Sequence, residues 1–302
     1  MAGIEDAGGQ RLAGIGLMCG AVACFAGLDS SAKWLGSRGL DPLTIAWARY
    51  AVAVALVSFF VNPVTTPQVV RSNRLGLQAL RSVLLLGSTA FNFVAVQHLQ
   101  LAETVSIQFA TPLLVALLAG PLLGEWVGPR RLVAIAAGFV GVLVVVSPGP
   151  GGIQPAALLC LGNVVCYAFY ILTTRRLASI DSSATTTFYS GLAGVALLTP
   201  ALPLIWTTPT SPLVWGLLLA LGFFGAFGHW LFVLAHARAP AAVLAPFIYT
   251  QLLWMLILGW LVFGDVPGAW TLAGAGVVVA SGLYLLSRER VRGVEPKAAP
   301  RA

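Results

Sequence analysis

Long apolar stretches recur along the whole chain, separated by short segments that hold most of its charged residues. The hydrocarbon core of a bilayer is about 30 Å thick, and a helix crosses it in about 20 residues. Only 9% of the residues are charged and 58% are hydrophobic, whereas a soluble chain carries about a quarter charged residues. The sequence therefore predicts an all-α polytopic membrane protein of ten transmembrane helices, embedded in a lipid bilayer. The expected spans are Leu12–Leu35, Leu43–Val61, Leu77–Val96, Thr104–Leu123, Leu132–Val146, Pro155–Thr174, Thr185–Ile205, Leu213–Ala235, Ala241–Phe263 and Trp270–Leu286.

The basic residues give these spans a direction. If the N-terminus is cytoplasmic, the cytoplasmic side receives 14 of the 17 Lys and Arg residues, with Arg81 counted among them. The other side receives Arg38, while Lys33 and Arg49 fall inside spans. Cytoplasmic loops of membrane proteins are enriched in Lys and Arg. We therefore expect both termini in the cytoplasm, a location in the inner (plasma) membrane, and no nucleic-acid partner for the net charge of +7.

The two halves of the chain resemble each other. Residues 19–37 match residues 161–179 at six of 19 positions, and Gly124-Glu125 falls on Gly264-Asp265 at an offset of 140. We therefore expect five-helix repeats at 1–149 and 153–287, followed by a basic cytoplasmic tail at 288–302. Because five is odd, the second repeat enters the membrane from the opposite side. Inverted repeats are common in transporters, where the substrate site lies near the midplane; duplicated bundles can also be receptors, scaffolds or lipid-handling proteins.

Several motifs resemble the EamA repeat of the drug/metabolite transporter superfamily. They are the run from Val96 to Leu113, Leu123-Gly-Glu125, Gly138-Phe-Val-Gly141, Asp41-Pro42 followed by Arg49, and Pro246-Phe-Ile-Tyr249-Thr-Gln251 followed by Phe263-Gly-Asp265. Trp126 departs from the family, which usually has a basic residue after the Gly-Glu pair. The resemblance implies ten helices, cytoplasmic termini and a central cavity lined by both halves. It leaves the substrate open.

Ionisable residues at membrane depth are costly and are functional candidates. Asp29, Lys33, Arg49 and Glu103 lie in the outer third of the predicted spans. Asp29 and Lys33 stand at i and i+4, the order that favours pairing on a helix. This group is either a neutralised ion-pair cluster with a snorkelling lysine, or an external gate or charged anchor for a zwitterionic substrate.

Two polar helix faces indicate a substrate site. Gln108 and Thr111 lie one turn apart beside Pro112, and Thr250, Gln251 and Trp254 share one face of the ninth span, with Tyr249 next to them. At the offset of 140, Thr111 aligns with Gln251. We therefore predict a substrate-binding site formed by Gln108, Thr111, Tyr249, Gln251 and Trp254. Asn92, Tyr167 and Tyr170 are further hydrogen-bonding candidates, and His229 leaves proton or ion coupling open.

Motifs of other function classes are missing from the sequence. It contains no GxxxxGK[ST] phosphate loop and no HExxH pair, and Cys19, Cys24, Cys160 and Cys166 form no CxxC motif. We therefore expect no enzyme activity, no cofactor and no metal site. The function predicted is that of a secondary transporter moving a small metabolite, amino acid-like or another small organic solute, by alternating access. The alternative is a non-transporting or lipid-handling membrane protein. The sequence gives no prediction of the oligomeric state, whether monomer or oligomer.

Overall fold

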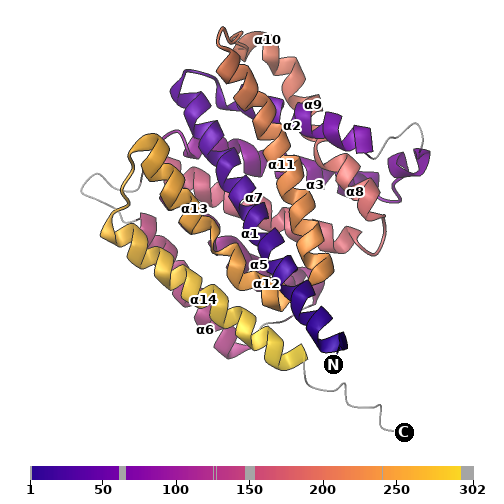
Figure 1. Cartoon of the computed structure of the whole chain (residues 1–302), viewed down its shortest axis with the longest axis vertical. Helices are drawn as coiled ribbons and strands as arrows, with labels where there is room; N and C mark the ends of the chain where they lie inside the picture. The colour runs from indigo at the N-terminus through magenta and orange to yellow at the C-terminus, as the bar shows by residue number, and fades with distance from the viewer. Residues whose placement is uncertain are drawn as a thin grey trace.

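The chain is almost entirely helical. The computed structural model describes residues 2–60, 66–124, 126, 128–146, 154–239 and 241–293, and these form helices and turns with no strand. In chain order the helices are α1 (Ala2–Ser37), α2 (Pro42–Phe60), η1 (Pro67–Val70), α3 (Leu75–Ala95), α4 (Leu101–Gln108), α5 (Ala110–Leu123), α6 (Pro129–Val146), α7 (Pro155–Leu177), α8 (Ser183–Ser190), α9 (Leu192–Leu198), η2 (Thr199–Ala201), α10 (Leu202–Ile205), α11 (Pro212–Arg238), α12 (Ala241–Ile248), α13 (Gln251–Leu258), η3 (Gly259–Phe263) and α14 (Ala269–Gly293) (Figure 1).

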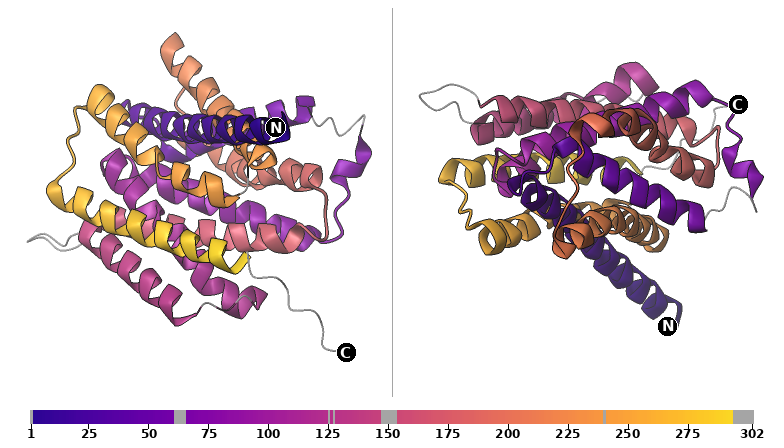
Figure 2. Two further views of the ribbon diagram at one scale, coloured as in Figure 1. Left: turned by 60° about the horizontal axis from the view of Figure 1, so that its bottom comes forward. Right: turned by 90° about the horizontal axis from the view of Figure 1, so that it is seen from above.

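Nine helical segments within the described residues are long and apolar enough to cross a membrane. The tenth predicted span corresponds to a shorter apolar stretch, Ala269–Leu285, inside α14. α1 begins and α14 ends on the same side of the bundle, and the first turns of α1 project beyond it (Figures 1 and 2). The predicted linker around 147–153 and the tail beyond residue 293 lie outside the described residues.

Three of the predicted spans are interrupted, which the apolar pattern did not indicate. The fourth divides into α4 and α5 at Phe109, the ninth into α12 and α13 at Tyr249 and Thr250, and the seventh into α8, α9, η2 and α10. Pro112 cannot donate a backbone hydrogen bond to the fourth residue before it, so the Gln108 carbonyl loses its usual helical partner. At the interruption of the ninth span, the Thr250 hydroxyl donates a hydrogen bond to the Phe247 carbonyl at 2.6 Å.

Helices from the two halves pack in matching pairs. α1 packs along α11, α3 along α7, and α6 along α14 (Figure 1). Residues 132–140 of α6 and 272–280 of α14 show the same order of buried and exposed positions. A Cβ at Gly138 would lie 3.2 Å from the Cβ of Ser281, and one at Gly141 would lie 2.9 Å from Cγ2 of Val278. At the offset of 140, Gly138 corresponds to Val278 and Gly141 corresponds to Ser281, so exchanging the two halves turns one contact into the other.

The two helices that end at the repeated Gly-acid motif end in the same way. Gly124 closes α5 with φ 76°, and Gly264 closes η3 with φ 69°. Glycine adopts this left-handed conformation without the steric cost that a Cβ brings. Glu125 lies outside the described residues, whereas Asp265 is described and enters the site below.

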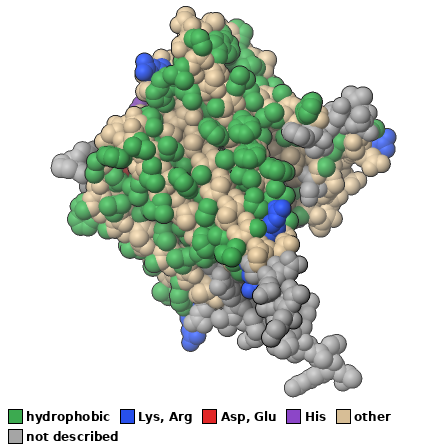
Figure 3. Space-filling view, viewed as in Figure 1, with side chains coloured by type: hydrophobic (Ala, Val, Ile, Leu, Met, Phe, Trp, Pro, Cys, Tyr) green, Lys and Arg blue, Asp and Glu red, His purple; other side chains and the backbone are tan. Residues whose placement is uncertain are grey.

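The outer surface is apolar. Large hydrophobic side chains such as Phe59, Trp215, Trp230 and Trp260 are exposed, and hydrophobic side chains cover most of the face seen in Figure 3, with Lys and Arg at its margins. In water such a surface would drive aggregation. The helices are long enough to cross a membrane, so this apolar outer surface is the one that faces the lipid tails.

Candidate functional site

A chain of polar side chains crosses the interior of the first half. Gln108 Nε2 donates to Asn92 Oδ1 at 2.6 Å, and Asn92 Nδ2 donates to Asp29 Oδ1 at 2.8 Å. The three residues come from α4, α3 and α1, and Gln108 is the last residue before the interruption of the fourth span. Asp29 and Asn92 are 5% and 8% exposed. The predicted site residue Gln108 is thus joined to the predicted acid Asp29 through Asn92.

Arg49 extends this cluster from α2. Its Nη1 donates to the hydroxyl of Thr89, which lies one turn from Asn92 on α3. The Tyr50 hydroxyl also contacts Thr89, with 2.6 Å between the two oxygens. The Arg49 guanidinium lies 5.1 Å from the Tyr50 ring centroid and 5.9 Å from that of Phe93. Sequence patterns gave no signal for Thr89, because a threonine in an apolar helix is common.

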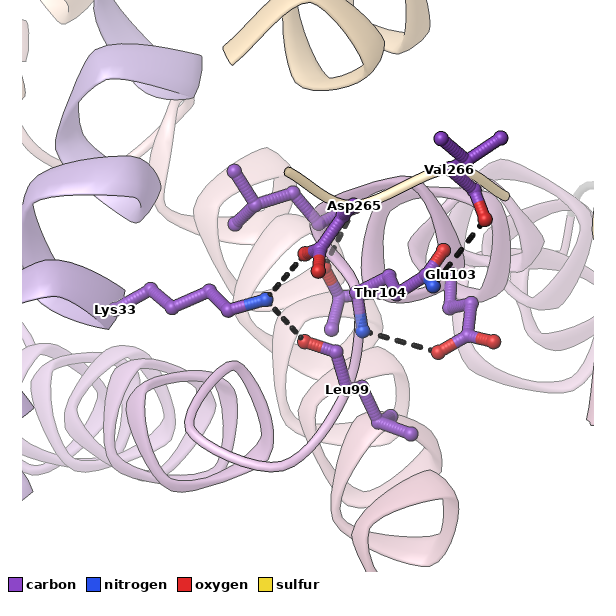
Figure 4. A network of polar contacts seen from close by, with 8 residues as sticks. Lys33, Leu99, Glu103, Thr104, Asp265 and Val266 are labelled. Carbon is purple, nitrogen blue, oxygen red and sulfur yellow. Dashed lines mark hydrogen bonds and ion pairs between the residues drawn. The ribbon is translucent and has the colours of Figure 1, made fainter. Parts of the chain in front are cut away.

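Lys33 forms the ion pair that joins α1 to the end of the ninth span (Figure 4). Its Nζ lies 2.7 Å from Asp265 Oδ2 and donates to the Leu99 carbonyl at 3.0 Å. The ammonium also lies 4.7 Å from the Phe263 ring centroid. The pairing of Lys33 with Asp29 that the i, i+4 spacing favours is therefore not formed. The lysine is held instead by a carboxylate and a carbonyl.

Glu103 supports the same network from α4. Its Oε2 accepts from the backbone N–H of Gln100 at 3.0 Å, which caps the start of α4, and Gln100 Nε2 donates to the Val266 carbonyl at 3.4 Å (Figure 4). Glu103 thus stabilises a helix end and makes no ion pair among the described residues. We define the latch as Lys33, Asp265, Leu99, Gln100 and Val266.

The predicted site residues of the ninth span do not join the polar chain. The Tyr249 ring packs edge-on against Phe109, with centroids 4.8 Å apart, and its hydroxyl lies over Gly282. Gln251 is half-buried and forms no hydrogen bond with described residues. Trp254 is 39% exposed. Thr111 is buried on α5, beyond the interruption.

Arg81 is a buried arginine near the start of α3; it was counted with the cytoplasmic basic residues, and it lies inside the predicted span Leu77–Val96. It lies within α3 and is 4% exposed. Nε donates to Thr174 at 2.7 Å, Nη2 to the Tyr170 hydroxyl at 2.7 Å, and Nη1 to Ser190 and to the Thr186 carbonyl, both at 2.9 Å. These contacts tie α3 to α7 and α8.

The remaining aromatic candidates pack against neighbouring rings. Tyr167 and Tyr170 stack with centroids 5.4 Å apart. The His229 ring lies 5.0 Å from that of Phe25 on α1. This contact joins α11 to α1, and it gives His229 a packing role in this conformation. Among the described residues no cluster of His, Cys, Asp and Glu could hold a metal ion.

Known proteins match the chain over nearly its whole length. The sequence model of the EamA-like transporter family matches residues 12–147 and again residues 154–288. The chain belongs to the EamA-like transporter family. A riboflavin transporter of Vibrio cholerae is 30% identical over 272 residues, which cover 88% of this chain and 90% of that protein. A riboflavin transporter of Brucella anthropi is 27% identical over 90% of this chain and 98% of its own length.

Other relatives carry a different solute. An S-adenosylmethionine uptake transporter of Rickettsia prowazekii is 26% identical over 87% of this chain and 88% of its own length. A solved crystal structure superposes with a TM-score of 0.63 at 16% identity, covering 94% of this chain and 99% of that one, which establishes the fold alone. The predicted family is confirmed. The EamA protein described here is a multi-pass membrane protein and a secondary transporter of small metabolites.

Proposed function

We propose that this EamA protein carries riboflavin, or a solute with similar ring and hydroxyl groups, across the inner membrane by alternating access. The observation that carries the proposal is the buried Asp29–Asn92–Gln108 chain at the interrupted fourth span. It places hydrogen-bonding groups inside an otherwise apolar wall, the combination that small-molecule sites use. The riboflavin transporters of Vibrio cholerae and Brucella anthropi favour this solute class over the amino acid-like class.

The architecture proposed for this cycle is ten helices in two inverted five-helix repeats. The matched pairs α1 with α11 and α7 with α3 support it, because an inversion that exchanges the halves turns one pair into the other. The exchanged contacts of Gly138 and Gly141 with α14 support it at the level of residues. Phe109 and Tyr249 are equivalent at the offset of 140 and touch each other. A residue that contacts its own equivalent lies close to the two-fold axis.

The latch is the proposed external gate. With cytoplasmic termini, Lys33 near the end of α1 and Asp265 after η3 lie on the external side. Their ion pair joins the first half to the second, so outward opening would require it to break. Gln251 and Trp254 complete the proposed substrate site from the second half, together with Gln108, while Tyr249 and Thr111 contribute to its walls.

Uptake into liposomes tests this function. Purified protein should move radiolabelled riboflavin with saturation, and excess unlabelled riboflavin should compete more strongly than S-adenosylmethionine. A proton gradient imposed on the same vesicles reports coupling. Saturable uptake of S-adenosylmethionine in place of riboflavin would change the solute class. Movement of fluorescent lipid without uptake of either solute would favour the lipid-handling alternative.

Reporter fusions test the topology. Alkaline phosphatase should be active after Gly151, Pro209 and Pro267, and inactive after Asn73, Gly128, Ser179 and the C-terminus, because alkaline phosphatase folds only outside the cytoplasm. An active fusion at the C-terminus would contradict an even number of crossings.

A further inference from the structure

Arg49 and Arg81 both lie inside helices that are long and apolar enough to span a membrane, and their hydrogen bonding differs. A guanidinium has five N–H donors. Arg81 directs four hydrogen bonds to described groups on α7 and α8, so its role is to hold helices together. Arg49 directs one, to the Thr89 hydroxyl. The other donors of Arg49 meet no acceptor among the described residues.

Arg49 also forms no direct ion pair in the described part of the chain; the nearby carboxylate of Asp29 is hydrogen-bonded by Asn92 instead. The ion pair found there joins Lys33 to Asp265, and no carboxylate oxygen lies within 4.0 Å of the Arg49 guanidinium. The rings of Tyr50 and Phe93 beside it attract the charge without accepting a conventional hydrogen bond. A half-buried guanidinium within a membrane-spanning helix is costly when it is unpaired, so such a group is a functional candidate.

Arg49 is positioned where the two halves meet. Gly225 of α11 brings the second half close, since a Cβ at that glycine would lie 3.5 Å from Arg49 Nε. On the other side, Thr89 connects Arg49 to the α3 face that carries Asn92 and hence Asp29 and Gln108. The free donors therefore belong to the same polar cluster as the proposed substrate site.

We propose that Arg49 anchors the transported solute by donating to two adjacent oxygen acceptors, and so determines specificity. This inference rests on the proposed transport function. Guanidinium presents its donors as a planar fork that fits paired oxygens. Two solutes of the relatives offer this chemistry: riboflavin through neighbouring hydroxyl oxygens of its ribityl chain, and S-adenosylmethionine through its carboxylate. Arg49 is thereby the group that supplies the strongest polar contact in the site.

Binding to variants of the purified transporter tests the anchor. The quenching of riboflavin fluorescence and the calorimetric titration of S-adenosylmethionine report which oxygen source binds. Arg49→Gln should raise the dissociation constant of the solute about 10- to 100-fold, as expected for the loss of a charge-assisted hydrogen bond. Arg49→Lys keeps the charge but loses the fork, so it should weaken binding nearly as much. Arg38→Gln is the matched control, because Arg38 stacks on Trp34 outside the cluster and its loss should leave binding unchanged.

A second readout does not depend on which solute is carried. Inorganic phosphate, compared with chloride at equal ionic strength, should raise the melting temperature of the wild type and of Arg38→Gln, and should not raise that of Arg49→Lys or Arg49→Gln. If the wild type binds neither solute, the proposed solute class is rejected. A phosphate response that depends on Arg49 would still support the anchor in that case. Equal affinity and an equal phosphate response in wild type and Arg49→Lys would overturn it.

Discussion

Two of the three interrupted spans, the fourth and the ninth, break at positions 140 residues apart and differ in chemistry. The fourth span breaks at Phe109, and the residue before the break, Gln108, enters the buried chain to Asp29. The ninth span breaks at Tyr249, and Gln251 beyond it meets no described polar partner. At the repeat offset of 142 the position of Asp29 is held by Ile171. Both spans break at corresponding positions, whereas the carboxylate that is buried among the described residues lies in the first half.

The largest effect is expected where the Tyr249 hydroxyl packs on Gly282, within the second half. Gly282→Val should lower the free energy of unfolding by about 3 kcal/mol, because its Cβ would lie 1.7 Å from the Tyr249 hydroxyl. The first half carries Phe109 and Val142 at the equivalent positions. Adding Tyr249→Phe should therefore recover part of the loss in a denaturation measurement.

Gly276→Val is the control for helix propensity, since a Cβ there would meet nothing within 4 Å. No recovery in the double variant would mean that the two halves do not share the packing inferred from Phe109 and Val142.

The second largest loss of stability is expected for the latch. Lys33→Gln or Asp265→Asn alone should destabilise the protein by about 2 kcal/mol, because each leaves a charge without its partner at the membrane boundary. The double variant should lose less than the sum of the two, and the double-mutant cycle measures this coupling. Additive losses would show that the ion pair does not hold the halves together.

The two glutamines should respond differently to leucine. Gln108→Leu breaks the bond to Asn92 and should cost about 0.6 kcal/mol of stability, the typical value between membrane helices. Gln251→Leu removes no described bond, so its stability should be unchanged while the apparent KM for the solute rises. Melting temperature and uptake are to be measured on the same preparations. Identical stability losses would contradict the asymmetry between the halves.

The smallest effect concerns a loop outside the spans. Hydrogen bonds, with that of the Ser72 hydroxyl the largest contribution, hold the pKa of Asp181 below its ordinary value. A depressed folded-state pKa adds stability above the unfolded pKa of about 3.9, and this stability is lost as the pH falls through the folded value. Asp181→Asn should therefore melt slightly below wild type at pH 7, and the gap should close below about pH 4. A gap that widens on acidification would have the wrong sign.

Hydrophobic length predicted the course of the chain well, because the bilayer imposes one constraint on every span. The interruptions escaped it. Pro112 lies three residues beyond the break at Phe109, and the break at Tyr249 and Thr250 contains no proline, so the pattern of apolar residues alone did not locate either break. Part of the candidate site could be predicted from the sequence, and part depends on packing. Gln108 and Asp29 stood out as polar residues in apolar spans, but the partner of Lys33 lies 232 residues away and depends on the packing of the halves.

The contact between Phe109 and Tyr249 bears on how such a protein can evolve. In a dimer of identical chains, a substitution at a position that meets its own copy alters both sides of the contact at once. Joining both halves in one polypeptide removes that coupling, so one side can keep a phenylalanine while the other gains a hydroxyl with Gly282 beneath it. A dimer of identical chains could not encode such a difference. Covalent linkage thus gives the transporter freedom to place unlike groups on its two sides, which a pair of identical subunits could not do.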